Sequence, residues 1–321
     1  MEKLEKILGN FEGKRIAVFG DVMLDRFFYV STEIFSPEEP GVPIGKIQKK
    51  ENKLGGAGNV ASNIISLGGQ CTIYGMIGND KEGRIIDFLA QEERINSIWI
   101  KDGRETTTKT RIIAVRNNQT RQLYRLDEEN EKDISRSLAN SVLKSLNNDK
   151  FDGVILQDYG KGFLTDYLMR QIVDYANKNK TPIFVDPKYK LVKNATVFKP
   201  NKKELLTLSR GKSLEDCFSK LYNKIHPKYL VVTVGNEGMY IYDGNSSNQI
   251  RTVAKEVIDV MGAGDTVIAS LALAYISGAN IYEACEIANH AAGIVVGKSG
   301  TATVNLDEIK KSFKDNGVIL K

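Results

Sequence analysis

The sequence is poor in the residues that build disulfide frameworks and metal centres. Its 321 residues include three cysteines, widely spaced and without a CxxC pair, and two histidines. An odd number of scattered cysteines argues against a disulfide framework or a zinc site and is typical of a reducing compartment. Two histidines leave little material for a histidine-rich metal centre or a Ser–His catalytic pair.

Long hydrophobic runs and strong net charge are also lacking. No stretch approaches the roughly 18 uncharged apolar residues of a membrane span, and the charged N-terminus lacks the apolar core of a signal peptide. The net charge is +5, with no concentrated block of Lys and Arg. We therefore expect a cytoplasmic protein that binds neither nucleic acid nor membrane, and whose charge is compatible with an anionic small-molecule substrate.

The sequence does contain a regular alternation of strands and helices. Apolar, strand-like segments occur at 15–21, 71–78, 96–101, 151–158, 181–187, 196–201 and 229–235. Helical periodicity occurs at 56–69, 81–93, 133–148 and 165–178, and in two helices that close the chain from about 264 to 297. This alternation predicts an α/β fold with a doubly wound, mostly parallel sheet flanked by helices.

Two stretches interrupt the alternation. Residues 27–50 and 106–129 have the pattern of successive strands joined by polar turns. They predict a small second β-sheet, inserted at about 26–50 and 106–129 of a single domain that spans 1–321. Such a sheet could cover an active site as a lid or provide an edge for dimerisation, and the two roles are compatible.

A Gly-Ala-Gly-Asp sequence at 262–265 opens an apolar helix. A helix N-terminus presents unpaired N–H groups that attract anions, and glycines let a phosphate approach them closely. Asp265 beside such a site is consistent with a base that takes the proton from a hydroxyl attacking phosphorus. Taken alone, the short motif favours the simpler interpretation, in which Asp265 caps the helix.

Three further motifs are ambiguous when considered singly. Asn201 and Glu204 of NKKE lie on one helical face and could hold Mg²⁺ through water or form an ordinary capping box. TVGNEG (233–238) could lie along nucleotide phosphates or form a hairpin. GAGNVA (56–61) fits a variant of the dinucleotide fingerprint, but follows the first strand by some forty residues, so we prefer a close backbone approach to a ligand over NAD.

Several basic residues fall in or just after the expected strands. We expect some of them to bind a substrate phosphate and others to pair with acids. These residues are Lys109, Arg111, Arg125, Lys161 and Lys188.

In order along the chain, the motifs resemble those of the ribokinase-like (PfkB-type) carbohydrate kinases, over nearly the whole chain. They are GDVMLD (20–25), GGAGN (55–59), NKKE (201–204), TVGNEG (233–238) and DVMGAGD (259–265). Finer details are similar to one branch, the bacterial D-glycero-β-D-manno-heptose 7-phosphate kinases of lipopolysaccharide core synthesis. These details are GDVMLDRF, SPEEPGVPI (36–44), TTTKTRIIA (106–114), QLYRLDEE (122–129) and AAGIVVGKSGTATV (291–304).

The resemblance implies a transfer of phosphate from ATP, with Mg²⁺, to the anomeric hydroxyl of a heptose 7-phosphate. Asp265 would be the catalytic base, and the N–H groups of Gly262, Ala263 and Gly264 would form the anion hole. Asn201 and Glu204 would organise Mg²⁺, through water, and the ATP phosphates. The rest of the nucleotide site would comprise Thr233, Gly235 and Asn289.

For the sugar, the resemblance implies two sets of residues. Its hydroxyls would bind to Asp25, Gly55, Gly56 and Asn59. Its 7-phosphate would bind to Lys109, Arg111, Arg125 and Lys188. A monovalent cation near Asp259 and Val260 and a homodimer formed through the lid strands would also be compatible with the family.

The sequence departs from the family at three places. Met261 stands where Ser or Thr usually precedes GAGD, and Gly58 stands where Ala is common. No His-x-Gly-His nucleotidyltransferase segment is present before Lys321, so we expect a separate adenylyltransferase to act downstream. Three alternatives stay open from the sequence: another sugar or phosphosugar as acceptor, a nucleotide or sugar sensor without catalysis, and an NAD dehydrogenase.

Overall fold

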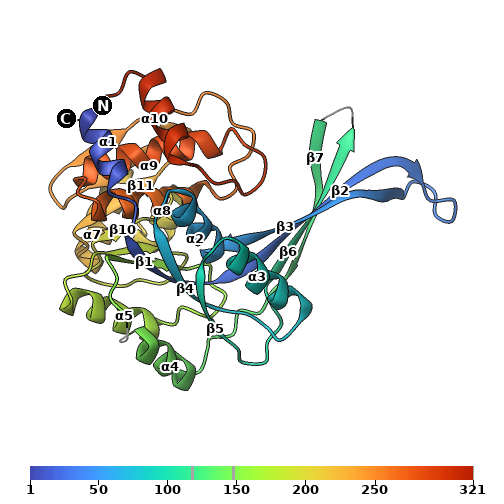
Figure 1. Cartoon of the computed structure of the whole chain (residues 1–321), viewed down its shortest axis with the longest axis horizontal. Helices are drawn as coiled ribbons and strands as arrows, with labels where there is room; N and C mark the ends of the chain where they lie inside the picture. Colours follow the sequence, from blue (N-terminus) through green and yellow to red (C-terminus); the bar gives the residue numbers. More distant parts are fainter. Residues whose placement is uncertain (117–118, 147–148, 321) are drawn as a thin grey trace.

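The computed structural model describes residues 1–116, 119–146 and 149–320, and they form two β-sheets with helices packed around the larger one (Figure 1). The main sheet has the strand order β13-β12-β11-β10-β9-β8-β1-β4-β5, and its pairs are parallel except for β11–β12 and β12–β13, which are antiparallel. Its strands are β1 (Arg15–Gly20), β4 (Gln70–Met76), β5 (Asn96–Ile100), β8 (Gly153–Gln157), β9 (Ile183–Asp186), β10 (Val197–Phe198), β11 (Tyr229–Thr233), β12 (Met239–Tyr242) and β13 (Ser247–Ile250).

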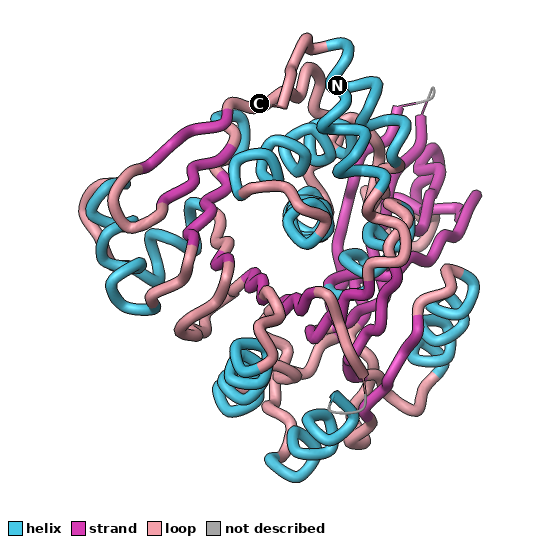
Figure 2. The backbone as a smooth tube through the Cα atoms, turned by 60° about the vertical axis from the view of Figure 1, so that its left-hand side comes forward, coloured by secondary structure: helices cyan, strands magenta, loops and turns pink. Residues whose placement is uncertain are grey.

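Helices cover both faces of this sheet (Figure 2). On one face lie α1 (Glu2–Gly9), α2 (Ala57–Ser66), α3 (Lys81–Glu92), α8 (Ala263–Ile276), α9 (Ile281–Val295) and α10 (Leu306–Asp315). On the other lie α4 (Arg136–Leu146), α5 (Asp166–Lys178), α6 (Lys202–Ser209) and α7 (Leu214–Ile225). Strand β1 alternates between the two apolar cores, because Ile16 and Val18 point to the first and Ala17 and Phe19 to the second.

The small sheet extends away from the body, on the side opposite the two chain termini (Figure 1). It consists of β2 (Val22–Phe35), β3 (Pro43–Gly56), β6 (Thr108–Arg116) and β7 (Gln119–Glu128), in the order β3-β2-β6-β7. Strand β2 starts one residue after β1, so Asp21 is the point at which the chain leaves the main sheet. Strand β3 returns to Gly56, which is the N-cap of α2.

The predicted α/β architecture and small second sheet are confirmed. The statement that two helices close the chain is wrong, because α10 follows them. Its charged segment buries only Ile309 and Phe313, too few apolar positions to stand out in the sequence. Helices α1 and α7 were also missed. Residues 147–148 of the expected helix at 133–148, residues 117–118 of the expected strands and residue 321 lie outside the described residues.

That residues 1–321 form a single domain stays a prediction. Within the described part of the chain, no helix combines the length and the apolar character needed to cross a bilayer.

His290 in α9 is a buried titratable group that contributes to the core. Its ring stacks on Phe313 of α10 with a centroid separation of 3.8 Å, and its Nδ1 lies 2.8 Å from Ser312 Oγ. Its Nε2 has no hydrogen-bond partner among the described residues, since Glu286 Oε1 is 3.8 Å away. Burial lowers the pKa of His290 to about 4.

This burial predicts a loss of stability on acidification. Between about pH 6.5 and 4 the unfolded chain binds a proton at His290 that the folded chain does not, so the free energy of unfolding falls by on the order of 3 kcal/mol as the pH drops through that window. Urea titrations at several pH values measure this slope. It should be shallower in His290→Gln and unchanged in His226→Gln, the exposed control. An equal slope in wild type and His290→Gln would contradict the prediction.

Candidate active site

The first turn of α8 lies at the edge of the main sheet where the parallel strands end. Gly262 is the N-cap of α8 and has a left-handed φ of 76°. A Cβ at this position would lie 2.5 Å from Asn59 Nδ2, so both the backbone conformation and the close neighbour require glycine. Because Gly262 is the N-cap and no side chain caps the helix, the interpretation of Asp265 as a helix cap is wrong.

The carboxylate of Asp265 is instead bound by donors from elsewhere in the fold. Asn59 Nδ2 donates to Oδ2 at 2.8 Å, from α2. Tyr159 OH and Gln157 Nε2 both donate to Oδ1, at 2.7 and 3.1 Å. Only 3% of Asp265 is exposed.

These surroundings set the proton affinity of Asp265. Burial raises its pKa to about 7, against the opposite effect of the hydrogen bonds from Asn59 and Tyr159. Nearby Asp186 also raises this pKa, and Lys199 lowers it. A carboxylate with a pKa close to neutral pH is suited to accept a proton during a reaction.

A buried ion pair beside Asp265 was missed in the sequence. Lys199 Nζ lies 2.9 Å from Asp186 Oδ2, and Lys199 is 2% exposed. Gln157 Nε2 bridges the two acids, since it also donates to Asp186 Oδ2 at 3.2 Å. Burial raises the pKa of Asp186, while Lys199 acts in the opposite direction. The signal that could have identified the group is its position, because Gln157, Asp186 and Lys199 end or directly follow parallel strands.

A cavity of about 650 Å³ opens next to the first turn of α8. Of the sequence-predicted site residues, it is lined by Lys188, Asn201, Glu204, Thr233, Gly235, Ala263, Gly264, Asp265 and Asn289. The Lys199–Asp186 pair lies in the same wall, and a Cβ on Gly264 would be 3.8 Å from Lys199 Nζ. Small apolar side chains line another part of the cavity, among them Ala254, Val257, Val260, Ala292 and Val296.

Asn201 and Glu204 form the capping box that was one of their two interpretations. Asn201 Oδ1 accepts from Glu204 N and Glu204 Oε2 accepts from Asn201 N, both at 2.9 Å. Glu204 Oε1 accepts from Lys188 Nζ at 3.4 Å, so Lys188 lies with this group in the cavity wall. The described residues contain no cluster of three or more His, Cys, Asp or Glu side chains that could hold a metal.

The remaining predicted residues gather on one face of the small sheet. Arg111 donates to Asp25 Oδ1 at 2.6 Å, and both side chains are buried. The strand register places Lys109 next to Asp25, and Arg125 next to Arg111. A Cβ on Gly55 would lie 2.5 Å from Asp25 Oδ2, so glycine there makes room for this carboxylate.

The basic residues singled out in the sequence differ in their partners. Arg125 binds Asp127 of its own strand through two nitrogens. The Lys109 ammonium lies 5.8 Å from the centre of the Tyr159 ring, and burial lowers the pKa of Lys109. Lys161, also singled out in the sequence, pairs with Glu129 and Glu131. This confirms the expectation that some of the basic residues pair with acids.

Two predicted positions have simple backbone partners. Asn289 Nδ2 donates to Arg251 O at 2.8 Å. The carboxylate of Asp259 accepts from the backbone N–H groups of Met261 and Gly300, each at 3.0 Å, which fixes the segment that leads into α8. The monovalent cation expected near Asp259 and Val260 stays a prediction.

Comparison with solved structures finds the same fold in other proteins. Phosphofructokinase-2 from Escherichia coli, solved in complex with potassium, superposes with a TM-score of 0.77 at 18% identity, covering 95% of this chain and 100% of the other. Arabidopsis thaliana ribokinase, complexed with ribose and ATP, superposes with a TM-score of 0.69 at 19% identity, covering 94% and 99%. At these identities, the similarity establishes the fold.

Curated relatives are much closer in sequence. The protein named Bifunctional protein HldE of Sulfurimonas denitrificans is 40% identical over 318 residues, which is 95% of this chain and 65% of that protein. The protein of the same name from a Nitratiruptor species is 39% identical over 306 residues, covering 92% and 64%. The chain thus spans slightly less than two thirds of the length of these relatives.

The family model described as pfkB family carbohydrate kinase matches residues 14–308, which include both sheets and the first turn of α8. The chain therefore belongs to the pfkB family of carbohydrate kinases, which transfer a phosphoryl group to a sugar hydroxyl.

Proposed function

We propose that this kinase transfers the γ-phosphoryl group of ATP to the anomeric hydroxyl of D-glycero-β-D-manno-heptose 7-phosphate, giving the 1,7-bisphosphate. The observation that carries the proposal is the buried carboxylate of Asp265, which has a pKa of about 7 and lies in a cavity wall beside a helix N-terminus. The choice of acceptor rests on the motifs shared with heptose 7-phosphate kinases and on the cations of the small sheet.

The cavity fits ATP in its division between polar and apolar walls. Lys199 and the first turn of α8 suit phosphates, and Ala254, Ala292 and Val296 suit a purine ring. Mg²⁺ keeps most of its waters and binds largely through substrate phosphates. Asn201 and Glu204 would hold it through water, and the ion would neutralise phosphate charge.

The hydrogen bonds of Asp265 support a position for the attacking sugar hydroxyl. An ionised carboxylate offers about four acceptor positions. Two on Oδ1 are taken by Tyr159 and Gln157, and one on Oδ2 by Asn59. The attacking hydroxyl therefore donates to the free position on Oδ2 and leaves its proton there as it attacks. The N–H groups of residues 262–264, together with Lys199, would stabilise charge on the transferred group, and that of Ala263 would do so in place of its bond to Val260 O, which is 3.3 Å long.

The small sheet would bind the rest of the sugar. Asp25 and the glycines at 55 and 56 face the sugar hydroxyls, with Asn59 at the junction to Asp265. Lys109, Arg111 and Arg125 lie on the same face and would bind the 7-phosphate. Lys188, which contacts Glu204, is better placed for the nucleotide phosphates.

A sugar panel tests the choice of acceptor. We expect kcat/KM for heptose 7-phosphate to exceed that for the unphosphorylated heptose by about 100-fold or more, because each charge-assisted hydrogen bond to the phosphate contributes roughly 1.5–3 kcal/mol. ADP release measures the rates, and fructose, ribose and fructose 6-phosphate are tested as alternative acceptors. Lys109→Met should reduce the preference and leave the KM for ATP unchanged. A preference for an unphosphorylated hexose would defeat the proposal.

Replacing the base tests the mechanism. Asp265→Asn should lower kcat by roughly 10²- to 10⁴-fold, since it removes general-base catalysis, while ATP binding stays nearly intact. In the wild type, kcat/KM should fall as the pH drops below about 7, where Asp265 becomes protonated. Near-normal turnover by the variant would disprove this role.

The same substitution has a matched stability readout. Because folding raises the pKa of Asp265, the folded chain holds a proton that the unfolded chain has lost between about pH 4 and 7. The wild type should therefore lose free energy of unfolding relative to Asp265→Asn as the pH rises through this window. Urea titrations of both proteins at the same pH values measure the difference and show that the variant is folded.

We also infer that a second copy of the chain covers the outer part of the small sheet. Tyr124 and Leu126 of β7 are 66% and 57% exposed, on the face opposite Arg125, and β3 and β7 are edge strands. Sedimentation equilibrium should show a dimer for the wild type and a monomer for a Tyr124→Glu, Leu126→Lys variant. Ile319→Lys, on the far side of the molecule, is the control. A monomeric wild type would contradict the inference.

A separate adenylyltransferase would act downstream of this reaction. The curated relatives are named bifunctional, which places two activities in one protein there. The expectation that a separate protein acts downstream of this chain stays a prediction.

A further inference from the structure

The loop between β8 and α5, residues 158–165, joins the small sheet to Asp265. Its Tyr159 hydroxyl donates to Asp265 Oδ1 at 2.7 Å, the shortest of the three bonds to that carboxylate. Burial raises the pKa of Tyr159 well above its usual value of 10, so the hydroxyl keeps its proton at any working pH. The position of this hydroxyl depends on the contacts that hold the loop in place.

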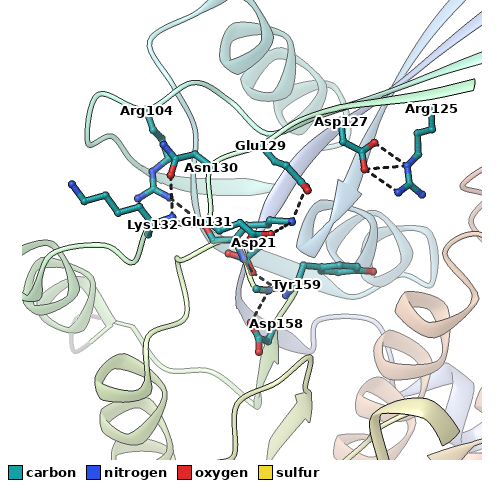
Figure 3. A network of polar contacts seen from close by, with 12 residues as sticks. Asp21, Arg104, Arg125, Asp127, Glu129, Asn130, Glu131, Lys132, Asp158 and Tyr159 are labelled. Atoms are coloured by element: carbon teal, nitrogen blue, oxygen red, sulfur yellow. Dashed lines mark hydrogen bonds and ion pairs between the residues drawn. The ribbon is translucent and has the colours of Figure 1, made fainter. Parts of the chain in front are cut away.

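The first anchor of the loop is Asp21, at the point where the chain leaves β1 for the small sheet (Figure 3). Its buried carboxylate accepts three backbone N–H groups of the loop, from Tyr159 at 2.8 Å, Lys161 at 3.0 Å and Phe163 at 3.1 Å. The three hydrogen bonds are 2.8–3.1 Å long, and the carboxylate that accepts them is buried. The loop is therefore fixed to the base of β2.

The second anchor is Lys161, which reaches the segment that follows β7. Its ammonium lies 2.7 Å from Glu129 Oε2 and 2.7 Å from Glu131 Oε1. Arg104 joins the same two segments, because it donates to the carbonyls of Lys161 and Lys132 (Figure 3). The loop and residues 129–132 are therefore cross-linked by charged groups on two sides.

Packing at Gly162 closes the gap between these segments. The residue has a φ of 85°, and a Cβ there would lie 2.1 Å from Lys132 O. The backbone N–H of Ile134 donates to Gly162 O at 2.9 Å. Because no side chain fits between the two backbones, the loop cannot shift without the chain that leaves β7.

Charged groups from several elements surround Tyr159 and Asp265. The acids are Asp25 on β2 and Asp186 at the end of β9. The cations are Lys109 on β6, above the Tyr159 ring, and Lys199 after β10. The Tyr159 hydroxyl differs from all of them, since it is the neutral donor that touches the Asp265 carboxylate from the side of the small sheet.

We propose that Tyr159 is a positioning residue for Asp265, and that Lys161, through Glu129 and Glu131 just beyond the end of β7, fixes the loop that carries Tyr159. The hydroxyl of Tyr159 occupies Oδ1, which leaves Oδ2 to the substrate, and it favours the ionised carboxylate over the protonated one. The inference rests on the proposed role of Asp265 as the base. It makes the placement of the small sheet a determinant of the proton affinity of that base.

The test is the pH profile of kcat/KM for Tyr159→Phe, a substitution that removes only the hydroxyl. The acid limb should move upward by about one pH unit, because the ionised form has lost a charge-assisted hydrogen bond. At a pH above the shifted limb, the rate should return to within a few-fold of the wild type. A profile that keeps its midpoint, or a loss of equal size at every pH, would overturn the role of Tyr159.

A double-mutant cycle tests the connection to the small sheet. Lys161→Met should move the limb in the same direction by a smaller amount, and should add nothing in the Tyr159→Phe background. Lys190→Met is the matched control, because Lys190 lies outside the loop and its ammonium pairs with Asp133 of the same connecting segment, and it should leave the midpoint in place. An equal shift from Lys161→Met in both backgrounds would show that Lys161 acts by another route.

Asp265→Asn separates this inference from the function on which it rests. An active Asp265→Asn enzyme would show that Asp265 is not the base, which would overturn the proposed mechanism and this inference together. An inactive Asp265→Asn enzyme, together with an unmoved midpoint in Tyr159→Phe, would overturn the role of Tyr159 alone. An inactive Asp265→Asn enzyme with the expected shift in Tyr159→Phe, absent from Lys190→Met, supports both.

Discussion

The burial of one carboxylate, that of Asp265, is the constraint on which the site depends. A carboxylate out of water is costly unless hydrogen bonds compensate for the lost solvation. Here the compensation is partial, because three neutral donors bind the carboxylate and burial still raises its pKa to about 7. The donors come from α2, β8 and the following loop, so the proton affinity of one residue depends on the packing of several elements.

The path of the chain explains how the small sheet and the base share one location. Strand β2 leaves the main sheet at Asp21, which anchors the loop of Tyr159. Strand β3 returns at Gly56 and passes directly into α2, which carries Asn59. One end of this hairpin therefore contacts the loop of Tyr159, and the other continues into the helix of Asn59, and both of these residues bind Asp265. A displacement of the base of the hairpin would therefore change the hydrogen bonds to the Asp265 carboxylate.

The fold was largely predictable from the sequence because most buried strands are continuous apolar segments that alternate with helical segments. The elements that were missed have physical causes. Helix α10 buries two apolar residues, and β12 follows the glycine turn of TVGNEG, which was open to a phosphate-binding or a hairpin interpretation. The small sheet was predicted from two stretches of successive strand-like segments joined by polar turns. Its register, which brings Asp25, Lys109 and Arg111 onto one face, depends on pairing between strands that are far apart in the sequence.

The site was predictable only where a short motif carried it. Asp265 and Asn59 were both identified, but that they bind each other is a tertiary fact, since 206 positions separate them. Asp186, Lys199, Gln157 and Tyr159 stand in no motif, and their chemistry arises from the meeting of parallel strand ends. Asn201 and Glu204 are the converse case. The simpler interpretation, a capping box, describes their contacts, and both residues also line the cavity.

The most direct measurement of the central claim is the titration of the Asp265 carboxyl itself. Infrared difference spectra between wild type and Asp265→Asn, with ¹³C-labelled aspartate, isolate its C=O band as a function of pH in the free chain. The account predicts a midpoint of about 7. A midpoint near 3.8, the ordinary value for an aspartate, would show that burial does not set the proton affinity of this residue and would contradict the account.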